Sequence, residues 1–478
     1  MLRPVPPAQP LSTAEQFALD VLVDLSRLVV SESGDGVELH VVGERSQPTL
    51  QDIRARKWAI EPRDGRVEME RGVLSLVANI VGAVDEQRSS ESDRYERVPP
   101  HVNTLVHHAE ERDPVVNRVA NGLHYTVRAA AGTRRVVLLS PWPDGKRWAM
   151  AMTHDLDVVD FWPAYSALRI GQLLSHGDLP RAVAVAASAG PALLGNPVHR
   201  AAEHILDVER RHGIKSTWFV IAGTPTLASL RAGDVTYAPE SSTARQVVGA
   251  ATRQGHEIGL HGSFASFTHR DVFETQRARL AAIAGQPSVG VRQHFIRMRP
   301  GRSHAAMAAA GFAYDSTFGF SERNGFRLGV ADVVPVWSDN EQRVLPIDAA
   351  PFIWMDRALS KHQHVEDPRA WITDAIATAG TCRDVSGLWT GIWHPNMTAA
   401  LGFPGAAAQF ERLCELLMQD APWPTTLSGA VAWRRARRQA RAVGVDASGA
   451  VRLRQGTTGP APVGLENDQG KPIPHVAA

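Results

Sequence analysis

The sequence has almost no cysteine: Cys382 and Cys414 are the only two among 478 residues. Two cysteines cannot build a disulfide framework or a cysteine-rich zinc module. Any metal bound by this chain would therefore have nitrogen and oxygen ligands, for which the sequence offers 19 histidines and 50 Asp and Glu residues.

Long hydrophobic runs are also missing. The stretch that follows the Pro-rich amino terminus, residues 18–30, is interrupted by Asp20, Asp24 and Arg27. A secretory signal needs an uninterrupted apolar segment, and a membrane span needs about 20 apolar residues. We therefore expect a cytoplasmic protein with no membrane partner.

Positive and negative charges are nearly balanced: the sequence has 51 Lys and Arg residues and 50 Asp and Glu residues, which gives a net charge of +1. This balance argues against broad electrostatic capture of nucleic acid. The basic run 434–438 lies on an expected helix, and we interpret it as a solvated helix face. The oligomeric state is left open.

The length exceeds the usual 100–200 residues of one domain, and turn residues at 141–145 divide the chain. We expect an accessory amino-terminal domain of unknown role over residues 1–145, with helices at 14–30 and 113–130 and strands at 37–43 and 135–140. The main domain covers 146–445. Residues 446–478 are rich in Gly and Pro in their later part and predict a disordered tail.

One pattern recurs in the main domain: a helical stretch ends in Gly213, Gly255 or Gly311, and an apolar strand begins at once. Strands that alternate with helices in this way predict an α/β fold with parallel strands. In such folds the active site lies at the carboxyl ends of the strands. Residues 158–198 are Ala- and Leu-rich and predict a helical insertion that could serve as a lid.

Two carboxylates follow the first strand of this domain. The apolar run 148–152 leads into Thr153-His154-Asp155-Leu156-Asp157. Side chains alternate along a strand, so Asp155 and Asp157 point the same way if the strand stays extended. Such a pair repels unless a cation or a shared proton intervenes. The alternative is that one caps a helix and the other is simply exposed.

Three later strands end in histidine. His261 follows the strand after Gly255, His294 lies on the expected strand 291–296 together with Arg292, and His394 ends the apolar strand 387–395. A single histidine at a strand end is usually structural. Three of them with two aspartates on neighbouring strands predict a functional site.

Residues 147–440 resemble the polysaccharide deacetylases of the NodB-homology type, carbohydrate esterase family four, in a divergent branch with a His-Asp-x-Asp first motif. The resemblance is in the order and spacing of five stretches, Thr153-His154-Asp155-Leu156-Asp157, Glu257-Ile258-Gly259-Leu260-His261-Gly262-Ser263, Arg292-Gln293-His294-Phe295, Tyr314-Asp315-Ser316-Thr317-Phe318-Gly319-Phe320 with Gly325-Phe326-Arg327, and Ile392-Trp393-His394. It implies a distorted (β/α) barrel.

The resemblance also implies a chemistry, the metal-dependent hydrolysis of a carbon–nitrogen bond in an N-acetylated sugar or glycan precursor. Asp155 is then the base, His394 the acid and Arg292 the residue that orients the base. Asp157 and His261 are metal ligands of a divalent ion, for which we expect zinc. The partner is a small-molecule or glycan substrate.

The sequence departs from the family pattern at the metal. Members have a second histidine four residues after the first, where this chain has Ala265. His294 is the expected replacement, with His154 or an additional water as alternatives. Two other functions stay open: a different amide or ureide hydrolase on the same barrel, and a non-catalytic carbohydrate-binding protein with a degenerate metal site.

Tryptophan is plentiful, with 12 residues against five tyrosines. Trp218, Trp354 and Trp393 lie on or beside the strands of the site. Their rings could stack on a sugar, although packing in the core is the simpler interpretation.

Overall fold

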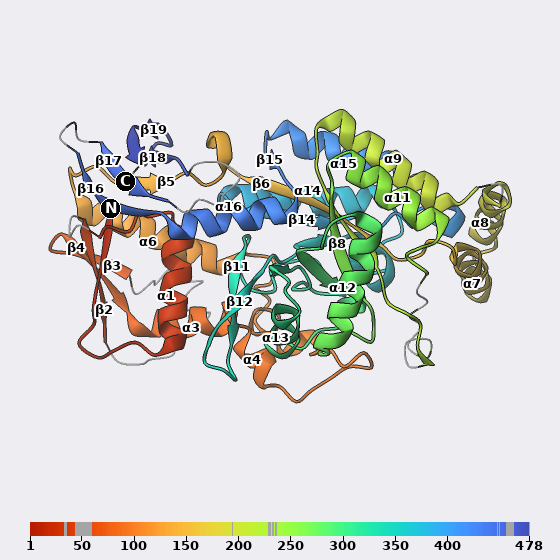
Figure 1. Cartoon of the computed structure of the whole chain (residues 1–478), viewed down its shortest axis with the longest axis horizontal. Helices are drawn as coiled ribbons and strands as arrows, with labels where there is room; N and C mark the ends of the chain where they lie inside the picture. Colours follow the sequence, from red (N-terminus) through yellow and green to blue (C-terminus); the bar gives the residue numbers. More distant parts are fainter. Residues whose placement is uncertain are drawn as a thin grey trace.

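The computed structural model describes residues 1–32, 36–43, 60–193, 195–227, 231, 234, 237–446, 448, 450–455 and 463–477. The molecule is elongated (Figure 1). A large sheet with its helices forms the middle, smaller sheets and both chain ends lie at one end, and a helical hairpin projects at the other.

The central sheet is mostly parallel. Within the described residues its strands follow the order β11-β12-β10-β9-β8-β7-β6-β14-β13, and β15 also pairs with β6. The strands are β6 (Ala149–Leu156), β7 (Thr217–Ile221), β8 (Glu257–Gly262), β9 (Gly290–Gln293), β10 (Tyr314–Asp315), β11 (Val334–Ser338), β12 (Arg343–Ala349), β13 (Trp354–Met355), β14 (Leu388–Ile392) and β15 (Trp423–Pro424). Among the strands that the structure describes in this sheet, only β11 and β12 pair in antiparallel fashion.

Helices connect the parallel strands, which confirms the predicted α/β class. They are α9 (Pro197–His212), α11 (Ser242–Arg253), α12 (Arg270–Ala284), α13 (Arg302–Ala309), α14 (Pro368–Asp384), α15 (Ala406–Gln419) and α16 (Leu427–Gln439). Gly213, Gly255 and Gly311 have φ values of 67°, 77° and 83°, as the helix–Gly–strand pattern predicts. No described residues pair β11 with β13, so the barrel is distorted and open between these strands.

Strand β6 lies at the centre of this arrangement. All eight of its residues are buried, as expected for a parallel strand covered on both faces. It pairs with β7 on one side and β14 on the other. The side chains at its carboxyl end therefore face the ends of both neighbouring strands.

The amino-terminal region has a sheet of its own, in the order β1-β2-β4-β3. Its elements are β1 (Leu2–Val5), α1 (Thr13–Ser26), β2 (Val37–Val42), β3 (Ile60–Arg63), β4 (Arg66–Glu70), α3 (Arg71–Val81), α4 (Val84–Arg88), α5 (Thr104–His107), α6 (Val115–Ala131) and β5 (Val137–Leu139). Helix α1 begins with a reciprocal capping box between Ser12 and Glu15. One continuous hydrophobic core includes Leu22 and Val77 of this region and Val220 and Leu260 of the central sheet.

The carboxyl-terminal tail is not disordered where the structure describes it, so that expectation was wrong. It contains β17 (Val451–Arg454), β18 (Leu465–Asn467), β19 (Pro472–Ile473) and β20 (His475–Ala477), which follow β16 (Arg441–Val445). Strand β18 pairs with β5, and β17 pairs with β16 and β20. The alternating apolar residues Val451, Leu453, Leu465 and Ile473 are buried in a shared cluster, which stabilises these short strands.

The basic run on α16 is not a solvated face either. Arg434 and Arg437 are each 1% exposed. Arg434 lies 2.7 Å from a carboxylate oxygen of Asp332, and Arg437 lies 3.0 Å from one of Asp24 on α1. The expectation was wrong because α16 packs between the amino-terminal region and the central sheet, where these carboxylates meet it.

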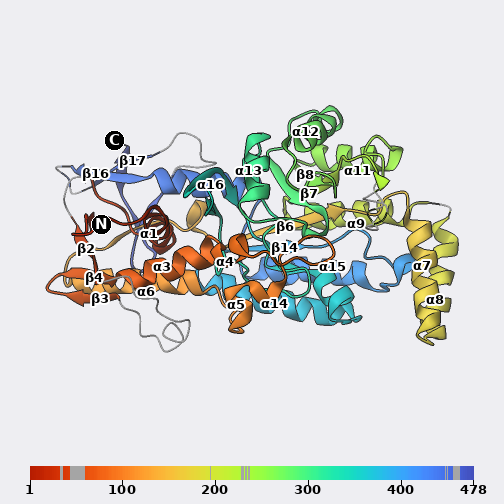
Figure 2. The same cartoon turned by 90° about the horizontal axis from the view of Figure 1, so that it is seen from below.

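The interval 158–198 contains α7 (Trp162–Ser175) and α8 (Leu179–Ala192), which pack on each other and project from the end of the molecule (Figure 2). Leu168 and Val183 remain 70% and 58% exposed on this hairpin. Among the described residues, no helix is long and apolar enough to span a lipid bilayer.

Candidate metal-dependent active site

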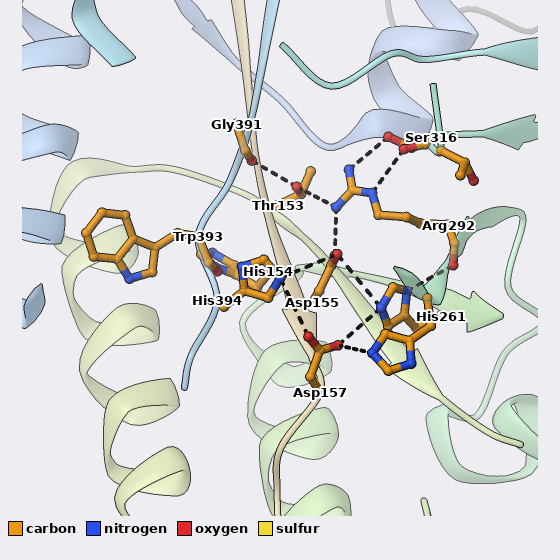
Figure 3. Close-up of polar contacts among 12 residues, drawn as sticks. Thr153, His154, Asp155, Asp157, His261, Arg292, Ser316, Gly391, Trp393 and His394 are labelled. Atoms are coloured by element: carbon orange, nitrogen blue, oxygen red, sulfur yellow. Dashed lines mark hydrogen bonds and ion pairs between the residues drawn. The ribbon is translucent and has the colours of Figure 1, made fainter. Parts of the chain in front are cut away.

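The carboxyl ends of four parallel strands bring together the six residues that the sequence predicted as a site. We call them the site cluster: Asp155, Asp157, His261, Arg292, His294 and His394. Figure 3 labels all of them except His294. They follow or end β6, β8, β9 and β14. Because these strands run parallel in one sheet, with β7 between β8 and β6, residues distant in the sequence meet at one edge of the sheet.

Asp157, His261 and His294 form the part of the cluster that could hold a metal ion. One ligand atom from each lies within 4.8 Å of the other two. Oδ1 of Asp157 is 3.1 Å from Nε2 of His261 and 3.7 Å from Nε2 of His294. Three nitrogen and oxygen donors around one point match a catalytic zinc site, in which water or substrate takes the fourth position.

The two imidazoles are oriented for this purpose by their other nitrogens. Nδ1 of His261 lies 2.9 Å from the main-chain oxygen of Arg292, and Nδ1 of His294 lies 2.9 Å from Oδ1 of Asp234. An oxygen at that distance requires a proton on Nδ1, which leaves the lone pair of the neutral ring on Nε2. Backbone and carboxylate partners of this kind are typical of metal-binding histidines.

An unpartnered carboxylate oxygen supports the fit of a cation. Oδ1 of Asp157 is buried but accepts no hydrogen bond from any described residue. Burial acts to raise the pKa of Asp157, yet His294 and His261 hold it well below its ordinary range. Asp157 therefore presents an ionised oxygen to the point that both Nε2 atoms face, so the residues fit a divalent metal.

Asp155 lies beside this set and is held by Arg292. Nη1 of Arg292 donates to Oδ1 of Asp155 at 2.7 Å and to Oγ1 of Thr153 at 2.9 Å, while Nη2 donates to Oγ of Ser316 at 2.8 Å. Burial acts to raise the pKa of Asp155, but Arg292 and then the nearby histidines outweigh it and lower the pKa. Asp155 is thus an oriented, ionised carboxylate.

His394 faces the two aspartates from the end of β14. Its Nε2 lies 4.0 Å from Oδ2 of Asp155 and 3.6 Å from Oδ2 of Asp157. Its Nδ1 lies 2.6 Å from Oδ1 of Asp356, and its main-chain nitrogen donates to Oδ2 of the same carboxylate at 2.7 Å. Burial acts to lower the pKa of His394, but Asp356 and the two site aspartates raise it overall. The ring is held ready to donate a proton from Nε2.

His154, one of the alternatives for the missing metal ligand, lies elsewhere. Its Nδ1 is 2.8 Å from the main-chain oxygen of Trp393 and its Nε2 is 3.0 Å from Oε1 of Glu209. Because side chains alternate along β6, His154 points away from Asp155. It belongs to a back cluster, which we define as His154, Glu209, Ser216, Trp218 and His256.

His294, rather than His154, is the further histidine that lies near Asp157 and His261. The strand carrying it is shorter than expected: β9 ends at Gln293, and residues 294–296 form a 3₁₀ turn in which Phe295 and Ile296 have φ values of 59° and 55°. This turn directs His294 to Asp157. The ring of Phe295 stacks on that of His294 with centroids 4.2 Å apart.

Two residues that orient the site were missed from the sequence. Asp356 follows β13, so the rule that directed attention to strand ends could have found it. Asp234 lies in the connection after β7, with no nearby motif, and its role is visible only in space.

The three tryptophans do not present their rings to a ligand. Trp218 and Trp354 are fully buried and Trp393 is 2% exposed. Trp354 stacks on Trp393 with ring centroids 6.1 Å apart. The suggestion that they bind a sugar was wrong, because aromatic packing in the core already covers their faces.

The inserted helix α7 reaches the site through Tyr165. Burial, followed by the negative charge of Asp157, raises the pKa of this phenol. The hydroxyl is therefore within electrostatic reach of the metal-binding set.

No protein-family model matches the chain, and a search of curated proteins finds no match. Solved structures resemble it over about three-fifths of its length. A protein designated a polysaccharide deacetylase, from Mycobacterium smegmatis, is 21% identical with a TM-score of 0.41 and aligns over 62% of this chain and 92% of its own. A second so designated, from Pseudomonas aeruginosa, is 15% identical with a TM-score of 0.41, over 64% and 96%.

The allantoinase PuuE is also similar, at 15% identity and a TM-score of 0.38, over 61% of this chain and 92% of its own. A pseudoenzyme of carbohydrate esterase family four, at 9% identity and a TM-score of 0.28, aligns over 61% of this chain and 68% of its own. No functional conclusion follows from likenesses at this level. The geometry of the site cluster must support any assignment.

Proposed function

We propose that this chain is a metal-dependent hydrolase of non-peptide carbon–nitrogen bonds that deacetylates an N-acetylated sugar or glycan precursor, with zinc as its metal. The observation that carries the proposal is the convergence of three metal-type donors, an Arg-held carboxylate and an Asp-held imidazole in one site. The assignment of an acetylated sugar as the substrate is based on the five sequence motifs.

When bound, a divalent ion supplies Lewis acidity toward the amide carbonyl and lowers the pKa of a neighbouring water. Asp157, His261 and His294 are the residues that would hold it. The Nδ1 atom of His261 contacts the main-chain oxygen of Arg292, and the Nδ1 atom of His294 contacts Asp234. These contacts fix the direction in which both Nε2 atoms point.

Asp155 is the proton acceptor of the reaction. Its ionised carboxylate takes a proton from the attacking water while Arg292 keeps it oriented. His394 is the proton donor: its Nε2 passes a proton to the leaving nitrogen, and Asp356 stabilises the charged ring before that transfer. One carbon–oxygen bond forms, the carbon–nitrogen bond breaks, and the products are acetate and a free amine.

The intact donor set supports a catalytic role over a binding role without metal. In a degenerate site the position left by Ala265 would be vacant, but here His294 supplies a nitrogen donor with its own carboxylate partner. The acid and base are also both present, each with the residue that orients it.

The test is to incubate the zinc-loaded protein with a panel of N-acetylated sugars, a ureide and a cyclic imide. Acetate and ammonia are measured in parallel. Release of acetate that Asp155→Asn abolishes supports the deacetylase. Release of ammonia alone would assign the site to ureide hydrolysis, and no product from a metal-loaded protein would favour a binding protein.

A further inference from the structure

A second cavity lies outside the site cluster, between the amino-terminal region and the barrel. It has a volume of about 590 Å³. One wall is formed by residues 86–96, which include α4 and the segment after it, and the opposite wall by residues 267–269 and 297–302. The last two segments follow β8 and β9, the strands that lead to His261 and His294, so the cavity is at the same edge of the sheet as the site.

The carboxylates that line this cavity already have cationic partners. Oε1 of Glu86 accepts from Nε of Arg327 at 3.2 Å and from the Asn103 amide at 2.7 Å. Oε1 of Glu96 lies 3.0 Å from Nη2 of Arg297. Both negative charges are thus balanced within the protein.

Two arginines of the cavity, Arg299 and Arg302, make no ion pair among the described residues. Arg299 donates only one side-chain hydrogen bond among the described residues, from Nη1 to the main-chain oxygen of Ser89 at 3.4 Å. Arg302 makes no side-chain hydrogen bond or ion pair within the same part of the chain. Burial and then the charge of Arg302 lower the pKa of Arg299, and Glu96 and Asp93 offset this only in part. Arginine keeps its charge even so, and two like charges face one cavity.

A hydrogen bond and contacts with aromatic rings hold Arg297 in the cavity wall beside these two arginines. Nε of Arg297 donates to the main-chain oxygen of Tyr95 at 3.1 Å, and its guanidinium lies over the rings of Phe264 and Phe267 at 3.9 and 4.0 Å from their centroids. At the start of α13, Gly301 has a φ of 75° and no room for a side chain, because a Cβ would lie 2.3 Å from Oε1 of Gln87. The backbone that carries Arg299 and Arg302 is therefore held close to α4.

We propose that this cavity binds a small organic anion whose phosphate or carboxylate group lies between Arg299 and Arg302. Guanidinium groups bind such oxyanions through charge-assisted hydrogen bonds, often in pairs. The hydroxyls of Ser89, Ser90 and Thr268 line the same cavity and supply further donors. Its volume falls within the range of small-molecule sites and exceeds what inorganic phosphate would fill.

Isothermal titration calorimetry of the full chain tests this proposal with four probes at constant ionic strength: inorganic phosphate, glucose 6-phosphate, glucuronate and glucose. We expect saturable binding of at least one anionic probe and none of glucose. Comparing glucose 6-phosphate with glucuronate shows whether the anionic group is a phosphate or a carboxylate.

The matched variants are Arg299→Ala, Arg302→Ala and Arg253→Ala. Each of the first two should weaken binding about tenfold or more, since each removes a charged donor. Arg253 on α11 lies outside the cavity and makes no side-chain hydrogen bond or ion pair in the described structure, so Arg253→Ala should bind like the wild type. Arg302 is exposed, so its removal leaves the fold intact.

Binding must also be independent of the site cluster. An Asp157→Ala variant should keep the affinity for the anionic probe, because the cavity does not include that residue. The proposal is overturned if no anionic probe binds, if glucose binds equally well, if Arg299→Ala and Arg302→Ala both bind normally, or if Asp157→Ala abolishes binding.

Discussion

The two faces of β6 carry two buried groups of histidines and carboxylates with opposite character. In the back cluster, His154 uses both ring nitrogens within the protein, and Glu209 accepts from Ser216 at 2.8 Å as well as contacting His154. In the site cluster, the Nδ1 atoms of His261, His294 and His394 each have an oxygen partner within the protein. Their Nε2 atoms lie 3.1 to 4.0 Å from carboxylate oxygens of Asp155 and Asp157.

The difference separates a structural polar network from a reactive one. Buried polar groups are normally satisfied by hydrogen bonds, as in most of the back cluster, because an unpaired group costs stability. The site cluster leaves a buried carboxylate oxygen, Oδ1 of Asp157, without a hydrogen bond, and a bound ion would satisfy it. The following changes test whether the two clusters differ in this way.

The largest effect is expected from His394→Ala. Loss of the proton donor should reduce turnover by about 10²–10⁴-fold, the usual contribution of general acid catalysis. The metal content should stay the same, because Asp157, His261 and His294 are untouched. Steady-state kinetics with elemental analysis of the same sample measures both, and metal loss in this variant would show that His394 is a ligand.

A smaller effect is expected from Asp234→Asn, which weakens the contact that orients His294. The metal affinity should fall about 10–100-fold, as for other residues behind a metal-binding histidine. Competition with a chromophoric chelator measures it. Unchanged affinity would mean that His294 does not bind the metal.

Glu209→Gln is the counterpart in the back cluster. We expect a loss of about 1–3 kcal/mol in the free energy of unfolding, because His154 and Ser216 lose a charged, buried partner. Denaturant titration gives this value. The metal affinity should not change; if it dropped as in Asp234→Asn, the two clusters would act as one unit.

The smallest effect concerns the pH dependence of turnover. His394 must be protonated to donate, so turnover should fall as the pH rises through its raised pKa, which lies above the ordinary 6.5. Asp356 is the strongest of the charges that raise this pKa. Asp356→Asn should therefore move the alkaline limb of the pH–rate profile to lower pH, and an unmoved limb would contradict the role of His394.

Much of the fold and of the site could be predicted from the sequence, because the residues that indicated them lie close together in the chain. Gly213, Gly255 and Gly311 marked the ends of helices, and the strands after the first two lead into the site, as β7 and β8. Asp155 on β6 and Asp157 directly after it point the same way through simple alternation. These features depend only on neighbouring residues.

What escaped prediction depended on contacts between distant segments. Arg434 and Arg437 looked solvated, but Asp24 and Asp332 meet them from elsewhere in the chain. The tail from residue 446 looked disordered because its later part is rich in Gly and Pro, yet its apolar residues are buried in a shared cluster and β18 pairs with β5. Asp234 likewise has no local motif and is recognised only beside His294.

The most direct test of the central claim is the metal content of purified protein after incubation with zinc and removal of the excess. We predict one divalent ion per chain in the wild type, in Asp155→Asn and in Glu209→Gln, and almost none in Asp157→Ala. A wild-type protein without a stoichiometric ion, or an Asp157→Ala variant that retains it, would contradict the assignment of this site.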